Sequence, residues 1–454
     1  MIRNVLLVVC CFCISIFSSA KDNHSPNVLM IIVDDLRPQL GCYGYPETIS
    51  PNMDRIADEG TLFETAYVQV PVCGASRASM MTGLYPTATR FVTYYSSADK
   101  DAPNVPDLPS HLLTKGYTTI SNGKIYHNVD DSTNSWSELH RSPDFRIYLD
   151  DATKRMYRDK DAAYEAADVE DDAYPSGKMA IKIMDDLRKA KEAGTPFFIT
   201  AGFTKPHLPF NAPKKYWDLY DRNNLDLAGN PYSPKDAPMQ SLHEWHELRS
   251  GYGGMPAEGP VSDELAKTLI HGYYACVSYT DKLIGDLLDE LERLEMDQDT
   301  VVVLIGDHGW QLGEHALWCK HSLYETSLHT PMVIKAPGYK PGQRTEALVE
   351  FVDLYPTICD LVGVSKPSHL QGKSLVKLMN NPNASVKEAI FARYHGGETI
   401  RTKMHQYSEW KGGASMFYDH SIDPDENINR INDPKYKSII KKMKKKLYDH
   451  REQL

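Results

Sequence analysis

Side chains that can bind metals or carry protons follow four separate apolar runs of this sequence. They are Asp34 and Asp35 after residues 28–33, Lys124 and His127 after residues 117–121, Lys205 and His207 after residues 197–203, and Asp307 and His308 after residues 301–305. One such pair could be a helix cap or a turn, but four together are harder to explain in that way. If the runs are strands of an open parallel sheet, all four groups lie at its carboxyl edge, where ligands bind in such folds.

Three carboxylates and one imidazole among these residues form a donor set for a hard divalent cation. Asp34, Asp35, Asp307 and His308 offer mainly oxygen atoms, which Ca²⁺ prefers and which also suit Mg²⁺. Zn²⁺ would favour more nitrogen and sulfur. We therefore expect a Ca²⁺ ion, with Mg²⁺ as the alternative.

Basic side chains are expected around that cation. Arg77, Lys124 and Lys320 together with a divalent ion would make a site too positive for a neutral ligand. A sulfate or phosphate ester fits such a site, because its oxygens need charge neutralisation while a bond to the central atom breaks. His127 and His207 could transfer protons near neutral pH.

The segment VPVCGASRASMMTGLYP places a lone thiol, Cys73, four residues before Arg77. Five of the eight cysteines lie beyond residue 20, an odd number, so at least one cannot pair within the chain. Cys276 and Cys359 lie in apolar, helix-like surroundings and are expected to be buried thiols. Cys73 is expected outside the core, because its neighbours are small and polar. Disulfide formation among Cys42, Cys276, Cys319 and Cys359 stays open.

The elements that must position these residues alternate between strands and helices. Strands of a parallel sheet are predicted at residues 28–33, 117–121, 197–203, 301–305 and 332–335. Helical patterns are predicted over residues 50–57, 178–191 and 265–294. This alternation favours an α/β fold.

A change in composition and in the predicted elements near residue 376 divides the chain into two predicted domains. Residues 21–375 form the catalytic domain, with a surface excursion at 150–175 and a long loop at 221–260 that is expected at the substrate rim. Residues 376–454 form a smaller C-terminal domain with short strand-like pieces and a final basic helix. That helix is expected to dock on the body; the alternative is a patch that holds a polyanion.

Composition limits the compartment and the partners. The net charge of -11 argues against nonspecific binding to nucleic acid or to an anionic membrane face. Residues 1–20 have the charged start, short apolar run and small-residue end of a secretory signal. No other long apolar segment predicts a membrane span. We expect a periplasmic or secreted protein, and its oligomeric state stays open.

These motifs resemble those of the type I sulfatases, the formylglycine-dependent family. The likeness runs through NVLMIIVDDLRPQLGCYG, VPVCGASRASMMTG, GDHGWQLGEHALWCKHSLYETSLHTPMVI and FYDHSIDPDENIN. It is similar to the iduronate 2-sulfatase branch through NGKIYH, FTKPHLPF and LGEHALWCKHSLYE. The resemblance implies an alkaline-phosphatase-like mixed sheet sandwiched by helices, followed by a smaller C-terminal α+β domain.

The resemblance also implies a fate for Cys73. A formylglycine-generating enzyme would oxidise it to an aldehyde, whose hydrate carries two hydroxyl groups. Ala75 stands where the family favours Pro, and Leu84 stands where it favours Arg. Because Ala is a tolerated variant in such motifs, conversion is still expected.

By matching position, the resemblance assigns a role to each site residue. Asp34, Asp35, Asp307 and His308 would hold calcium, and formylglycine 73 would add one oxygen. Arg77 and Lys124 would fix the diol and the sulfate oxygens. His207 and Lys320 would lie on the leaving-group side, with His207 as the acid. His127 would deprotonate the second hydroxyl, so that sulfate leaves.

The predicted activity is hydrolysis of a sulfate ester on a sulfated polysaccharide or glycosaminoglycan, with a uronate-containing glycan suggested by the branch. Two alternatives stay open. One is a phosphoester or phosphonate hydrolase of the same fold. The other is a non-catalytic glycan-binding relative with an unmodified Cys73.

Overall fold

The computed structural model describes residues 25–141, 146–157 and 160–454. The predicted signal segment at residues 1–20 lies outside the described residues. In the described part of the chain, no helix is both long and apolar enough to cross a membrane.

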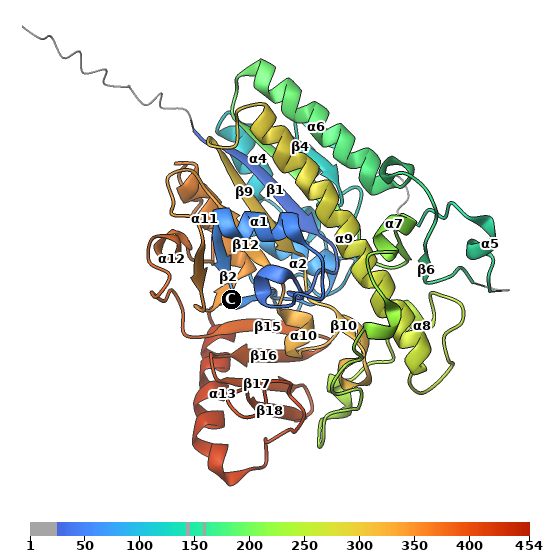
Figure 1. Ribbon diagram of the computed structural model, residues 1–454. Coiled ribbons are helices and arrows are strands. Elements are labelled where there is room, and N and C mark those ends of the chain that lie inside the picture. The colour runs from blue at the N-terminus through green and yellow to red at the C-terminus, as the bar shows by residue number, and fades with distance from the viewer. Residues whose placement is uncertain (1–24, 142–145, 158–159) are drawn as a thin grey trace, which may run out of the picture.

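A mixed eight-stranded sheet forms the centre of the larger part of the molecule (Figure 1). Its strands, in spatial order, are β13 (Gln343–Thr345), β2 (Thr61–Phe63), β12 (Met332–Lys335), β9 (Thr300–Gly306), β1 (Asn27–Val33), β7 (Phe197–Phe203), β4 (Thr118–Gly123) and β5 (Glu138–His140). The five predicted strands are all present, and the central ones are buried apolar runs, as strands covered on both faces must be.

The register of three central strands aligns their carboxyl ends. Val33 at the end of β1 pairs with Phe203 of β7 on one side and with Gly306 of β9 on the other. The three strands run parallel, so the residues after them emerge at the same edge. This alignment brings the segments that begin at Asp34 and Asp307 side by side.

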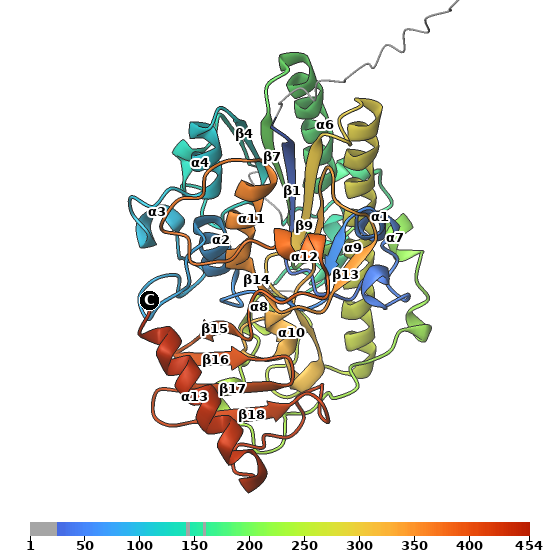
Figure 2. The same cartoon turned by 90° about the vertical axis from the view of Figure 1, so that its left-hand side faces the viewer.

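Helices cover both faces of this sheet (Figure 2). One layer contains α1 (Pro51–Glu59), α6 (Pro175–Ala193) and α9 (Asp263–Arg293), and the other contains α2 (Cys73–Thr82), α4 (Leu108–Thr114) and α11 (Leu354–Leu361). The three predicted helices correspond to α1, α6 and α9. Pro51 occupies the first turn of α1, where its missing N–H costs nothing.

Shorter elements connect this framework. The helices are α3 (Ala98–Asp101), α5 (Asp151–Lys154), α7 (Lys214–Trp217), α8 (His246–Arg249), α10 (Glu325–Leu328) and α12 (Val376–Asn380). The paired strands are β10 (Gln311–Leu312) with β11 (Trp318–Cys319), β3 (Ala66–Tyr67) with β14 (Val349–Glu350), and β6 (Tyr164–Glu165) with β8 (Phe210–Asn211).

A second, antiparallel sheet follows near the C-terminus. Its strands are β15 (Ile390–Tyr394), β16 (Gly397–Arg401), β17 (His405–Trp410) and β18 (Ser415–Asp419). The final helix α13 (Lys437–Arg451) packs against β16 and β17 with Met443 and Leu447 buried, so the predicted docking is confirmed. The predicted domain boundary at residue 376 stays a prediction.

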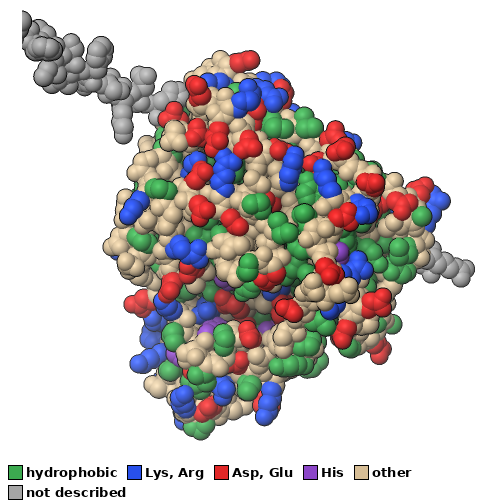
Figure 3. Space-filling view, in the orientation of Figure 1, with side chains coloured by type: hydrophobic (Ala, Val, Ile, Leu, Met, Phe, Trp, Pro, Cys, Tyr) green, Lys and Arg blue, Asp and Glu red, His purple; other side chains and the backbone are tan. Residues whose placement is uncertain are grey.

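Acidic and basic side chains are interspersed over the face shown in Figure 3.

Two expectations about local structure were wrong. The strand at residues 332–335 is antiparallel to β9, not parallel. The longest helix between β9 and β12 is the four-residue α10, so no crossover helix returns the chain to the opposite edge. Cys73 is buried, because all ten residues of α2 are inside the molecule. The small residues at the start of α2 permit this: a Cβ on Gly74 would lie 2.1 Å from the Tyr94 carbonyl oxygen.

Candidate active site

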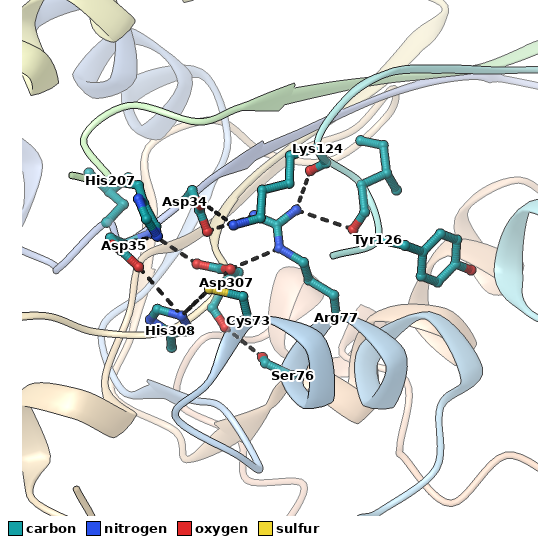
Figure 4. A network of polar contacts seen from close by, with 12 residues as sticks. Asp34, Asp35, Cys73, Ser76, Arg77, Lys124, Tyr126, His207, Asp307 and His308 are labelled. Carbon is teal, nitrogen blue, oxygen red and sulfur yellow. Dashed lines mark hydrogen bonds and ion pairs between the residues drawn. The ribbon is translucent and has the colours of Figure 1, made fainter. Parts of the chain in front are cut away.

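Asp34, Asp35, Asp307 and His308 meet at the carboxyl edge of β1 and β9 (Figure 4). The Asp35 amide donates to Asp307 Oδ1 at 3.0 Å, and His308 Nε2 lies 3.5 Å from Asp35 Oδ1. Asp35 has a positive φ of 61°, a left-handed conformation that Asp tolerates and that often marks functional sites. All four side chains are buried.

Arg77 joins helix α2 to this cluster. Its guanidinium donates to Asp307 Oδ2 at 2.8 Å and to Asp34 Oδ1 at 3.2 Å. It also donates to the backbone oxygens of Lys124 and Ile125, so it fixes the segment that follows β4 (Figure 4). The Lys124 ammonium in turn pairs with Asp34 Oδ2. Burial would raise the pKa of Asp34, but Lys124 and Arg77 hold that pKa well below its usual value.

Cys73 lies at the start of α2, against the acidic cluster. Its Sγ is 3.1 Å from His308 Nε2. Ser76, one turn later, donates to the Asp307 carbonyl oxygen at 2.5 Å and holds the helix start in place. The position of Cys73 therefore matches the predicted site, although its burial does not match the expectation from sequence.

A second group of charges faces the first across the site. Lys320 donates to Asp35 Oδ1 at 2.9 Å and to Glu247 Oε1 at 2.9 Å. His207 Nε2 is 2.9 Å from the same Glu247 oxygen, while Nδ1 bonds to the Leu208 carbonyl at 2.7 Å. Because Nδ1 donates to a carbonyl, Nε2 is the ring atom directed at Glu247. A carboxylate there favours a proton on Nε2.

The pKa shifts of this group follow from burial and charge. Burial and then Lys320 lower the pKa of His207, whereas Glu247 raises it. Burial would raise the pKa of Glu247, but Lys320 and His207 bring it well below its usual value. Glu247 is therefore an ionised partner of both predicted leaving-group residues.

His127 lines the cavity without a hydrogen bond at Nδ1. Its ring meets Tyr94 edge-on at 5.8 Å between centroids. Burial, followed by Lys124, lowers its pKa to about 3. The lowered pKa favours the neutral form of the ring.

Cys73, Lys124, His127, His207, Glu247 and Lys320 border one cavity of about 650 Å³. Five of the six predicted catalytic residues line the cavity, and the sixth, Arg77, is fully buried. The lining consists of Val72, Cys73, Tyr94, Gly123, Lys124, Tyr126, His127, Val129, Arg141, Arg146, Pro175, Ser176, Met179, Gly202, Thr204, His207, Glu247, Lys320 and His321. A volume of this size accommodates a small ligand or the terminal sugars of a glycan.

The donor atoms fit a hard cation. One ligand atom each from Asp34, Cys73, Asp307 and His308 lies within 4.8 Å of the others, and Asp35 forms an overlapping group with Cys73 and His207. His308 Nδ1 contacts the Gly309 carbonyl at 3.0 Å, which leaves Nε2 directed at the group, as in metal-binding histidines. Sulfur is the poor member of this oxygen-rich set, and an oxygen at position 73 would complete it.

Three other residues of the quoted motifs are Lys205, His315 and His321. Lys205 is buried and donates to the carbonyls of His207 and Pro209, so it shapes the loop that carries His207. His315 contacts the Asp425 carbonyl at 2.7 Å and does not line the cavity. His321 does line it. The five cysteines of the described chain are free thiols.

Sequence reasoning missed Glu247 and Arg141. Glu247 lies on α8 within residues 221–260, where only the expected position at the substrate rim hinted at a role. Arg141 follows the short strand β5. Neither residue sits in a motif, and both reach the cavity only through tertiary packing.

The likeness to known proteins covers nearly the whole chain. The family model described as Sulfatase matches residues 26–364, and one described as N-sulphoglucosamine sulphohydrolase, C-terminal, matches residues 313–453. Iduronate 2-sulfatase of Homo sapiens is 29% identical, with 94% of this chain and 91% of that protein covered. The Mus musculus enzyme is 32% identical over 78% of this chain and 72% of that protein.

Solved structures share the fold. A phosphonate monoester hydrolase of Agrobacterium radiobacter superposes with a TM-score of 0.82 at 21% identity, covering 94% of this chain and 96% of that one. A protein solved with its substrate D-glucosamine-2-N,6-O-disulfate gives a TM-score of 0.77 at 22% identity, covering 94% and 98%. With the family model spanning most of the sequence and the metal-donor cluster in place, the chain belongs to the sulfatase family and is a sulfuric ester hydrolase.

Proposed function

We propose that this enzyme removes sulfate from a sulfated polysaccharide or glycosaminoglycan, with formylglycine at position 73 as its nucleophile. The observation that carries the proposal is the position of Cys73, at a helix start inside a cluster of Asp34, Asp307 and His308. Similarity to the iduronate 2-sulfatases supports a uronate-containing glycan. The sequence of residues 1–20 supports export to the periplasm or the medium.

Hydrated formylglycine supplies a hydroxyl that attacks sulfur and a second hydroxyl whose deprotonation releases sulfate. Calcium, or magnesium as the alternative, would be held by Asp34, Asp35, Asp307 and His308 and would supply charge at the sulfate oxygens.

Side chains of the site described above would neutralise charge and transfer protons in the remaining steps. Lys124 and Lys320 line the cavity and bring positive charge to the sulfate, while Arg77 orients the Lys124 segment from behind. His207 presents Nε2 to the cavity, where it can protonate the departing sugar oxygen. His127 lines the cavity and its lowered pKa favours the neutral ring, which is the form required of a base for the second hydroxyl.

The decisive experiment is the intact mass of the peptide over residues 70–90 together with sulfate release. Protein co-expressed with a formylglycine-generating enzyme is expected to show a mass about 18 Da below that of the cysteine form, and sulfate release in proportion to the converted fraction. Protein expressed without that enzyme is the matched control. Full activity of the unconverted protein would refute the proposed nucleophile.

A panel of substrates tests the reaction class. Matched aryl sulfate, aryl phosphate and aryl phosphonate esters should be hydrolysed in that order of preference, with the sulfate first. A higher rate on the phosphonate would favour a phosphonate hydrolase of the same fold. No turnover of any ester by converted protein would favour a glycan-binding relative.

A further inference from the structure

Arg141 is a cationic side chain of the cavity that the proposed reaction does not use. It lines the same cavity as Cys73 and donates from Nη1 to the Asn128 carbonyl at 2.8 Å. Its Nε and Nη2 atoms are buried and have no hydrogen-bond partner. Buried guanidinium N–H groups without an acceptor cost free energy, so these two groups call for a partner such as a ligand, an ion or a bound water.

Asp131 is the carboxylate with the largest electrostatic effect on Arg141, but it accepts no hydrogen bond from Nε or Nη2 of that arginine. Burial lowers the pKa of Arg141 more than Asp131 raises it. The oxygens of Asp131 already accept from the amides of Ala98 at 2.9 Å and Asp99 at 3.2 Å. Within residues 25–141, 146–157 and 160–454, no carboxylate forms an ion pair with Arg141.

Arg141 borders the same cavity as Cys73 rather than a separate pocket. The segment from Lys124 to Asn128 receives hydrogen bonds from Arg77 at Ile125 and from Arg141 at Asn128. A substrate whose sulfate contacts Lys124 therefore places its neighbouring atoms within this part of the cavity.

The mouth of the cavity offers apolar faces for a sugar ring. Tyr94 lines the cavity and is 45% exposed, and Tyr95 beside it is 70% exposed. Val129, which also lines the cavity, is 72% exposed. Exposed aromatic rings of this kind combine contact area with a polar hydroxyl.

We propose that Arg141 binds a second anionic group on the substrate, through Nε and Nη2 as a two-pronged donor. A carboxylate or another sulfate has the oxygen spacing that a guanidinium recognises. The enzyme then selects a glycan that carries two anionic groups close together. This inference rests on the proposed function, because it assigns the specificity of that site.

The test compares pairs of substrates that differ in one anion. The first pair is a uronate 2-sulfate disaccharide and its carboxyl-reduced counterpart; the second is a disulfated hexosamine and its monosulfated form. For the wild-type protein, kcat/KM for the dianion should exceed that for the monoanion by about 10- to 100-fold in at least one pair. The pair that shows the preference identifies the anion.

Variants then assign the preference to Arg141. In R141Q the ratio should fall to about 1–3, and in R141K, which keeps the charge without the fork, it should be intermediate. R155Q, which removes an arginine whose side chain is 78% exposed, is the matched control and should keep the wild-type ratio. A thermal melt of each variant checks folding.

Two results would overturn the inference. A wild-type ratio near 1 in both pairs would show that no second anion is recognised. An equal loss on both members of a pair in R141Q would show that Arg141 only positions residues 124–128. Failure of converted wild-type protein to release sulfate from any substrate, aryl sulfate included, would instead overturn the proposed function.

Discussion

Replacing Glu247 with Gln tests how the leaving group is protonated. Glu247 Oε1 lies 2.9 Å from both His207 Nε2 and Lys320 Nζ, whose side chains are 9% and 3% exposed. Glutamine keeps the shape of the side chain but removes the charge that raises the pKa of His207. A smaller fraction of His207 then carries the proton that the departing sugar oxygen needs.

The expected loss follows from the strength of these bonds. A hydrogen bond to a charged group contributes about 1.5–3 kcal/mol, which corresponds to roughly 10- to 100-fold in kcat. The loss should be large for sugar sulfates, whose alkoxide leaving groups are strongly basic, and small for nitrophenyl sulfate, whose leaving group departs without a proton. The alkaline limb of the kcat profile should also move to lower pH.

The assay is kcat across a series of sulfate esters of increasing leaving-group basicity, measured from pH 5 to 9 for the wild type and E247Q. Glu244→Gln is the matched control, because Glu244 is exposed on the same segment. If kcat of E247Q fell by the same factor for every ester, the reasoning would be refuted, because the effect of a structural defect does not depend on leaving-group basicity.

Three further predictions follow from the geometry. Cys73→Ser should release no more than one sulfate per chain in a sulfate-release assay, because a serine ester lacks the second hydroxyl; sustained turnover would contradict this. Treatment with a chelator should abolish activity and added Ca²⁺ should restore it, with metal analysis of the purified protein as the check; full activity in metal-free protein would exclude the assigned donors. Burial opposes ionisation of Glu325, but Arg401 lowers its pKa to about 2, so this carboxylate stabilises the fold above pH 4.5 by about 2–4 kcal/mol and loses that contribution as pH falls toward 2. In thermal melts, E325Q should therefore be less stable than the wild type at pH 7, with a difference that shrinks below pH 4.5; a constant difference would contradict this.

The strands that precede the motifs could be predicted from the sequence, because the apolar pattern of each strand lies within a few consecutive residues. A buried strand such as β1 is a continuous apolar run, and a parallel register then fixes where Asp34 and Asp307 emerge. The direction of β12 could not be predicted from its own residues, because it depends on the connection after β9, which lacks a crossover helix.

The walls of the cavity could not be predicted, for a different reason. Glu247 lies on the four-residue helix α8 and Arg141 directly follows the short strand β5, and their roles depend on the partners that tertiary packing brings to them. The C-terminal sheet also reaches this region, since the ring of Tyr394 on β15 lies 5.8 Å from His321. The site residues that follow the strands could therefore be predicted from the sequence, whereas the other walls of the cavity depend on contacts between distant segments.

The environment of Cys73 itself argues that the thiol is not the working form of this side chain. Burial and then the charge of Asp34 raise its pKa well above the usual value, so a nucleophilic thiolate is disfavoured. Sulfur is also the soft atom in a group of carboxylate oxygens and one imidazole. Conversion to a hydrated aldehyde removes both difficulties, because hydroxyl oxygen suits the same cation as Asp34 and Asp307 and needs no thiolate. The surroundings of Cys73 therefore support the proposed conversion of its thiol to formylglycine.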